Sequence, residues 1–235
     1  MDENVKPFPN GLILQTIDRT NILEDNQTTI HIRRRKKPFD LDESTAPCCI
    51  FASHSIPVSS KVYYFEIRIQ SASKYDKVGI GFMSANPKAI ISMPGLEVDS
   101  VGYHGDDGYF YNGGRLKNSY GPKFNDNCIV GCGVDKRNNI LFFTKNGQSL
   151  GATCHLDDLS LIELQLSNQL FPAIGVYTAS DDDDDDDKSD NTHKNTKMKK
   201  AMQEKLLSDR GDIDNPELVI EVNFGQTSFA YDVGT

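Results

Sequence analysis

The sequence predicts an all-β protein built as a sandwich or a barrel. Short runs of β-type residues recur along the chain, turn signals separate them, and no convincing helix lies among them. The clearest run is VYYFEIRI at 62–69, where the odd-numbered residues from Tyr63 to Ile69 fall on one face and the even-numbered ones from Tyr64 to Arg68 on the other. This alternation is typical of a strand with one face toward a core.

The other elements follow in order along the chain. Strands are expected over 29–34, 78–83, 128–135, 139–147, 170–178 and 217–225. Asn-Gly at 146–147 predicts a hairpin because both residues tolerate positive φ, and KRNN at 136–139 predicts another turn. Eleven side chains are expected in the core: Tyr63, Phe65, Ile67, Ile80, Phe82, Val130, Val134, Leu141, Phe143, Ile174 and Phe224.

Two parts of the chain stand apart from this pattern. Residues 1–28 are expected to form an extension that precedes the sandwich or packs on it. Residues 180–215 begin with a run of seven aspartates and hold twelve acidic and seven basic residues in all. Since the aspartates repel one another and bury nothing, we expect a disordered surface insertion between two adjacent strands. The helical spacing of Met198, Ala201, Met202, Lys205 and Leu206 also fits a short helix.

Composition narrows the class of protein. The net charge is −9, of which the insertion supplies −5, so the acidity is local. Five cysteines, two of them adjacent, argue against a disulfide framework and for a reducing compartment. The polar N-terminus is unlike a signal peptide, and no run approaches the roughly 20 apolar residues of a membrane span. The expected location is the cytosol or the nucleus, with no membrane partner.

The stretch VGYHGDDGYFYNGG at 101–114 could form an active-site loop, a metal loop, a phosphate cradle or a β-turn. Its glycines do not match a dinucleotide or P-loop pattern. His104, Asp106 and Asp107 could be metal ligands, but calcium loops alternate their ligands along the chain. A polar turn with glycines at positive φ is the favoured interpretation, so no cofactor or metal is expected.

Other chemistry-bearing residues also favour simple interpretations. Cys128 and Cys132 face the same side of one strand and, without a C-x-x-C pair, suggest buried apolar cysteines. No nucleophile elbow occurs, so the chain is not expected to be an enzyme. The basic run RRRKK at 33–37 could bind nucleic acid, but the chain is acidic and no stacking aromatics are interleaved with it. Solvated charges at a strand end are favoured.

Seven motifs in order carry a family resemblance. They are YYFEIRI (63–69), VGIGF (78–82), PGLEVDSVGYHGDDGYFYNGG (94–114), YGPKFNDNCIVGCGVD (120–135), FFTKNGQSLG (142–151), LFPAIGV (170–176) and NFGQTSFAYD (223–232). Together they resemble a SPRY domain of the B30.2/SPRY superfamily, over 29–232 with the insertion 180–215 as an interruption. GYHGDDG, YGP and FTKNGQSLG are most similar to the SPRY domain of Ran-binding protein M-like scaffold subunits of CTLH/GID ubiquitin ligases.

This resemblance implies a bent, concanavalin-like antiparallel β-sandwich that binds short peptides through loops at one rim and catalyses nothing. It implies that VGYHGDDG is a strand that buries Tyr103 and then turns through 105–108. Carried onto this sequence, the binding positions are Arg34, Arg35, Lys74, Tyr75, Met93 and Tyr177. Arg and Tyr are also common anchors of protein interfaces.

Family members continue into LisH, CTLH and CRA segments, whereas this sequence ends at Thr235, so it is either a stand-alone SPRY protein or a fragment. The first functional hypothesis is a module that recruits a partner's short peptide, as a substrate-recruiting or scaffold part of a ubiquitin-ligase assembly. The second is a permanently docked subunit with the acidic insertion as its regulatory element. The first should show a shallow polar groove and the second a large apolar patch.

Overall fold

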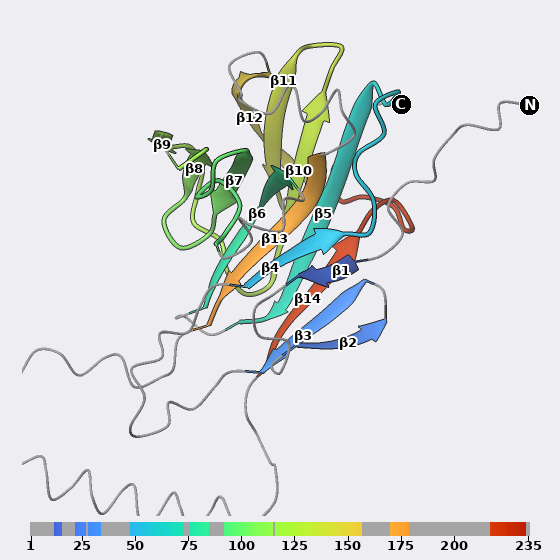
Figure 1. The fold of residues 1–235 in the computed structure, drawn as a ribbon, viewed down its shortest axis with the longest axis vertical. Helices are drawn as coiled ribbons and strands as arrows, with labels where there is room; N and C mark the ends of the chain where they lie inside the picture. The colour runs from blue at the N-terminus through green and yellow to red at the C-terminus, as the bar shows by residue number, and fades with distance from the viewer. Residues whose placement is uncertain are drawn as a thin grey trace, which may run out of the picture.

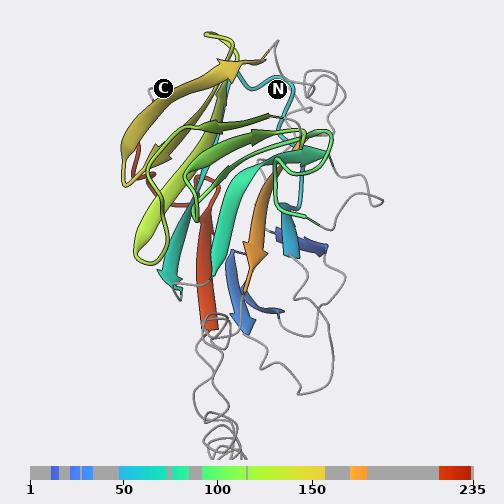
Figure 2. The ribbon, with the colours of Figure 1, turned by 90° about the vertical axis from the view of Figure 1, so that its left-hand side faces the viewer.

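Two seven-stranded antiparallel sheets stack face to face in the computed structural model (Figures 1 and 2). The structure describes residues 12–15, 22–26, 28–33, 48–72, 76–84, 92–114, 116–156, 170–178 and 217–233. Fourteen strands, β1 to β14, lie within these ranges. The antiparallel β-sandwich expected from the sequence is therefore confirmed.

Each sheet combines strands from distant parts of the chain. Sheet A has the order β1 (Leu12–Gln15), β4 (Cys48–Ala52), β13 (Leu170–Tyr177), β6 (Lys77–Ser84), β7 (Ser100–His104), β8 (Tyr109–Asn112), β9 (Leu116–Ser119). Sheet B has the order β12 (Gln148–His155), β11 (Ile140–Lys145), β10 (Cys128–Asp135), β5 (Val62–Ser71), β14 (Glu217–Asn223), β3 (Thr29–Arg33), β2 (Ile22–Asn26). Residues 12–15 and 22–26 of the expected N-terminal extension thus add an edge strand to each sheet.

The core lies between the two sheets. All eleven side chains expected there are buried, and each is at most 6% exposed. Phe82 of sheet A meets Tyr63 and Phe65 of sheet B edge-on, with ring centroids 6.2 and 5.7 Å apart. Such edge-to-face pairs add about 0.5–1.5 kcal/mol beyond the burial of apolar area. Cys132 is fully buried in the same core and Cys128 packs against it, as expected for apolar cysteines.

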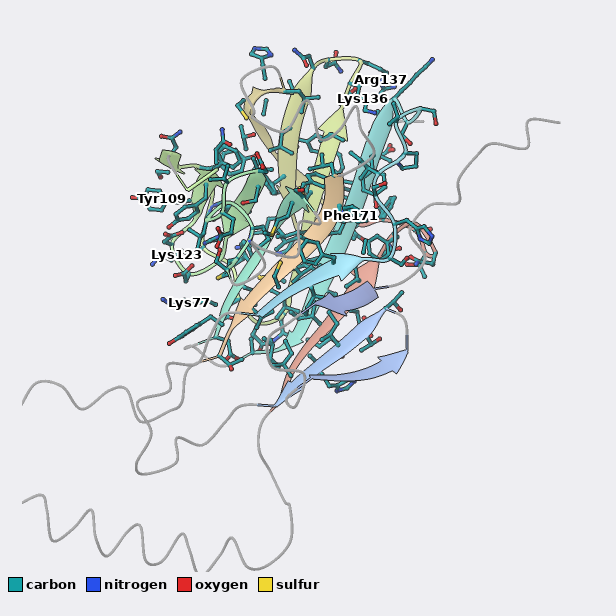
Figure 3. All side chains as sticks on the ribbon, in the orientation of Figure 1. Lys77, Tyr109, Lys123, Lys136, Arg137 and Phe171 are labelled. Atoms are coloured by element: carbon teal, nitrogen blue, oxygen red, sulfur yellow. The ribbon has the colours of Figure 1, made fainter. Side chains whose placement is uncertain are left out.

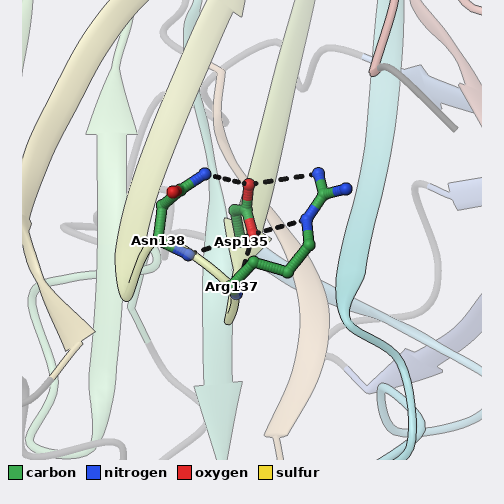
Figure 4. Close-up of polar contacts among 3 residues, drawn as sticks. All are labelled: Asp135, Arg137 and Asn138. Atoms are coloured by element: carbon green, nitrogen blue, oxygen red, sulfur yellow. Dashed lines mark hydrogen bonds and ion pairs between the residues drawn. The ribbon is translucent and has the colours of Figure 1, made fainter.

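The two turns expected next to β11 are confirmed. Asn146 and Gly147 have φ of 49° and 76°, and close the β11–β12 hairpin. At the β10–β11 turn, the Asp135 carboxylate accepts hydrogen bonds from the backbone and side chains of Arg137 and Asn138 (Figure 4). Burial alone would raise the pKa of Asp135, but these hydrogen bonds outweigh it and lower the pKa below 3.8.

The stretch VGYHGDDG forms a strand and a turn, as the favoured interpretation required. Tyr103 on β7 is fully buried, and its hydroxyl donates to the Pro122 carbonyl. Burial raises the pKa of Tyr103, so this hydroxyl stays protonated. The turn is closed by Gly108 N–H, which donates to the His104 carbonyl at 3.0 Å, and Gly108 has a φ of 78°. This stretch is therefore part of the architecture.

The expected insertion 180–215 lies outside the described residues. The strands before and after it were expected to be adjacent, and that expectation is wrong. β13 belongs to sheet A and β14 to sheet B, so the connection between them joins the two sheets. β5 and β6 are joined across the sheets in the same way by the short connection 72–76.

Candidate functional site

Several strands end together at one end of the sandwich, which we call the rim. β3 ends at Arg33, opposite the first residue of β14, and β5 ends at Ser71, opposite Val219 of β14. In sheet A the last residue of β13, Tyr177, pairs with the first residue of β6, Lys77. Figure 1 shows the ends of β3, β5 and β13 and the start of β14 in the lower part of the view. The rim therefore collects segments far apart in sequence.

Three side chains form the described part of the candidate site. The Lys77 ammonium lies 5.6 Å from the centroid of the half-buried Tyr177 ring, and its Nζ is 3.6 Å from Oδ2 of Asp106. The side chains of Lys77 and Asp106 are 48% and 31% exposed, so water and a ligand can reach both. In Figure 3 the Lys77 side chain projects outward from the edge of the molecule. The cluster offers a cation, a carboxylate and an aromatic surface.

The strand register explains why these groups meet. Lys77 and Tyr177 are a cross-strand pair on the outer face of sheet A, because Val78 and Val176 beside them point into the core. Asp106 comes from the turn after β7, and Gly105 N–H donates to the Val78 carbonyl at 2.9 Å. That hydrogen bond places the turn beside the start of β6. Sequence reasoning missed Lys77 and Asp106 because their proximity depends on this register.

Met93, one of the six expected binding positions, is almost fully buried. Its side chain is only 5% exposed and lies on the outer face of sheet A, on the same face as Tyr177. A Cβ atom added at Gly175 would lie 2.7 Å from Met93 Cβ, and one at Gly79 would lie 2.8 Å from Met93 Cε. Met93 therefore fills the space left by two strand glycines, as support beneath the surface.

The other four expected binding residues cannot be placed. Arg34 and Arg35 directly follow β3 in sequence, and Lys74 and Tyr75 lie between β5 and β6. All four lie outside the described residues, although the strands that flank them end at the rim. Of the six expected positions, Tyr177 is thus the one that the structure describes as partly accessible at the rim.

The turn at 92–99 is held against the outer face of sheet A by hydrogen bonds and packing. His104 donates a hydrogen bond from its Nε2–H to the Pro94 carbonyl at 2.8 Å, and its ring stacks on Tyr111 with centroids 4.3 Å apart. The Ser100 hydroxyl accepts from Gly95 N–H and donates to the Glu97 carbonyl. Tyr111 in turn donates to Asp107. His104 and Asp107 therefore help to hold this part of the structure together.

Within the described ranges, no group of three or more His, Cys, Asp or Glu side chains is arranged to hold a metal ion. In the same part of the chain, no helix has the length and apolar character needed to cross a membrane.

Comparisons with known proteins agree with this architecture. Ran-binding protein 9 of Mus musculus is 33% identical over 182 residues, which cover 77% of this chain and 25% of that protein. A Ran-binding protein M homolog of Arabidopsis thaliana is 34% identical over 131 residues, 56% of this chain and 26% of the relative. The chain thus spans about a quarter of the length of these relatives.

A solved structure and a family model complete the comparison. The crystal structure of a human SPRY domain matches with a TM-score of 0.51 and 29% identity, over 66% of this chain and 88% of that one. The SPRY domain model matches residues 62–181, about half of the chain. These residues run from β5 to just past β13 and include the Lys77, Asp106 and Tyr177 cluster. The chain therefore belongs to the SPRY domain family.

Proposed function

We propose that this chain binds a short peptide of a partner protein at the rim. SPRY domains are generally non-catalytic modules of protein interaction, which sets the class of function. The observation that carries the proposal is the cluster of Lys77, Asp106 and Tyr177, in which three elements bring a cation, a carboxylate and a ring to an accessible surface. Arg34, Arg35, Lys74 and Tyr75 extend this site in the proposal.

The chemistry of the cluster indicates the kind of peptide. An ammonium beside a tyrosine ring binds carboxylate or amide side chains and offers an apolar surface next to them. The Lys77 ammonium already pairs with a carboxylate, since its Nζ lies 3.6 Å from Asp106 Oδ2. An acidic side chain of the peptide would take the place of Asp106 in this pair. The expected ligand is therefore a peptide with acidic or amide side chains.

The alternative, a permanently docked subunit, receives less support. Stable docking generally requires a continuous apolar patch. Across the part of the chain that the structure describes, the exposed large hydrophobic residues are Val58, Leu96 and Val98. Leu96 and Val98 share one turn, whereas Val58 belongs to the loop held by Lys136 near the β10–β11 turn. Such scattered residues fit a domain that binds peptides transiently better than a permanently docked subunit.

A wider role also belongs to the proposal. The similarity to Ran-binding protein M homologs supports a role in recruiting substrates, or as a scaffold, within a ubiquitin-ligase assembly in the cytoplasm or nucleus. Co-purification of the tagged chain with ubiquitin-ligase subunits, in amounts close to its own, would support this role. If the chain co-purified with none of these subunits, the ubiquitin-ligase role would be contradicted. Peptide binding at the rim is tested separately.

The test of peptide binding uses an array of synthetic peptides that vary in acidic, amide and basic side chains. The folded wild-type chain is expected to select acidic or amide peptides. Tyr177→Ala should weaken the selected peptides by about 1–3 kcal/mol, roughly five- to 150-fold. His54→Ala is the matched control, because His54 is exposed and follows the end of β4 farther from the rim. Equal binding by both variants and the wild type would refute the proposal.

A further inference from the structure

The outer face of sheet B is covered over the middle of β5. Tyr64 and Glu66 point away from the core, yet they are only 5% and 6% exposed. Two glycines of β10 make this possible. A Cβ atom at Gly131 would lie 1.9 Å from the Tyr64 hydroxyl, and one at Gly133 would lie 2.5 Å from the Phe142 ring. The rings of Tyr64 and Phe142 stack with centroids 6.0 Å apart and an angle of 6° between their planes. We call these two rings the aromatic platform.

The chain's own C-terminal segment lies on the aromatic platform. The ring of Phe229 meets Tyr64 edge-on, with centroids 4.8 Å apart. The ring of Tyr231 lies 5.8 Å from Tyr64 and 5.9 Å from Phe142. The chain bends at Ala230 and Tyr231, and both aromatic side chains face the platform together. Ala230 between them presents its main chain instead.

Glu66 holds that main chain. Its two carboxylate oxygens accept the Ala230 N–H at 3.0 and 3.1 Å. The same carboxylate accepts from the Tyr64 hydroxyl at 3.2 Å and from Asn223 Nδ2 at 3.3 Å. Hydrogen bonds to a charged acceptor are roughly twice as strong as those between neutral groups. A buried carboxylate that binds a main-chain N–H between two aromatic side chains has the parts of a peptide-recognition site.

We propose that the aromatic platform and Glu66 form a second peptide-binding site, whose ligand is an aromatic–small–aromatic segment. Residues 229–231, Phe-Ala-Tyr, occupy it in this structure. The occupant is tied to β14 by a short turn, in which the Asn223 side chain accepts from Gly225 and Thr227 N–H. A short tether gives its ligand an effective concentration on the order of millimolar. A partner segment of the same pattern must therefore displace the chain's own segment to bind.

This site is separate from the rim. It lies on sheet B, against β5, β10 and β11, whereas Lys77 and Tyr177 lie on the outer face of sheet A. Binding to it would be recognised by dependence on Glu66 and on two aromatic side chains of the ligand. The acidic or amide peptides expected at the rim lack that pattern.

The test uses the full chain with Phe229→Ala and Tyr231→Ala, which weakens the tethered occupant, and a fluorescent peptide with the sequence of residues 225–233. Fluorescence anisotropy should show at least tenfold tighter binding to the double variant than to the wild type. A peptide with both aromatics replaced by Ala should bind at least tenfold more weakly. Adding Glu66→Gln to the double variant should weaken binding by about tenfold, since the amide keeps the shape but loses the charge. Tyr109→Ala is a matched control that should bind like the wild type.

Three results would overturn the proposal: the double variant binds no better than the wild type, the Ala-substituted peptide binds equally well, or Glu66→Gln has no effect. A double variant that fails to fold would be replaced by a second measurement. A protease site inserted between Gly225 and Gln226, both exposed, allows the tether to be cut in the otherwise unchanged chain. The cut segment should stay bound during gel filtration at high protein concentration, and unlabelled peptide should displace it. Its loss at once would contradict the proposal.

Discussion

Two glycines that pair across β13 and β6 allow the packing of the turn at 92–99 on sheet A to be measured. Gly175 and Gly79 are direct cross-strand partners, and both lie beneath Met93. A Cβ atom at Gly175 would meet Pro94 Cδ at 2.6 Å, Met93 Cβ at 2.7 Å and Met93 Cα at 2.8 Å. At Gly79 the nearest atom is Met93 Cε, the free end of a flexible side chain, at 2.8 Å.

The expected cost of each substitution follows from these contacts. At Gly175 the shortest contact is 0.8 Å closer than the 3.4 Å at which ordinary contact begins, and main-chain atoms must move to relieve it. Such overpacking costs about 1–3 kcal/mol. Replacing Gly by Ala recovers about 0.4–1 kcal/mol through the unfolded chain. Gly175→Ala should therefore lower the free energy of unfolding by about 1–2 kcal/mol. Gly79→Ala should lower it by about 1 kcal/mol or less, because the methionine end can turn aside and the His104 ring, whose Cδ2 would lie 3.0 Å from the new Cβ atom, has to shift by only a few tenths of an ångström.

Urea unfolding of the two variants beside the wild type gives both values, and equal m-values would show that the unfolded states are comparable. The matched pair separates steric pressure on the turn from the general effect of Ala in a strand. If Gly79→Ala proved as costly as Gly175→Ala, or if Gly175→Ala were neutral, Met93 and Pro94 would not pack on sheet A as described.

Three further outcomes are expected. Asp135→Asn should lower the free energy of unfolding by about 1–3 kcal/mol at pH 7, because a buried acceptor for Arg137 is lost. Because the folded-state pKa of Asp135 is lowered, its contribution to stability is present above pH 3.8 and is lost as the pH falls through the lowered value. In urea unfolding from pH 7 to 2, the free energies of unfolding of Asp135→Asn and the wild type should therefore converge. Lys77→Met should change stability by less than about 1 kcal/mol, because its ion pair with Asp106 is largely exposed, and thermal unfolding would measure this. Tyr103→Phe should cost about 1–3 kcal/mol in urea unfolding, since a carbonyl loses its donor.

Local chemistry in the sequence determined the fold class and part of the core. The alternation from Tyr63 to Ile69 predicted the inward face of β5, and the buried residues of that face confirm it. Asn146 and Gly147 predicted the β11–β12 hairpin because positive φ is a property of those residues themselves. The turn interpretation of the stretch around Gly105 succeeded for the same reason. Each of these features depends on residues close together in the chain.

Tertiary structure alone decided which of the distant residues meet. Lys77 and Tyr177 are neighbours because of the register between β6 and β13, which are separated by some ninety residues of sequence. Met93 is buried because Gly79 and Gly175 leave room for it, so its segment approaches sheet A more closely than its position in a loop suggested.

The even-numbered face of β5 shows the same division. Alternation correctly placed Tyr64 and Glu66 away from the core, but only the folded chain brings Phe229 and Tyr231 over them. The residues that cover this face lie more than 160 positions away, so the local sequence around Tyr64 does not indicate that they contact it. Periodicity reports which way a side chain points, whereas its burial and its partners depend on long-range packing that a local pattern does not contain.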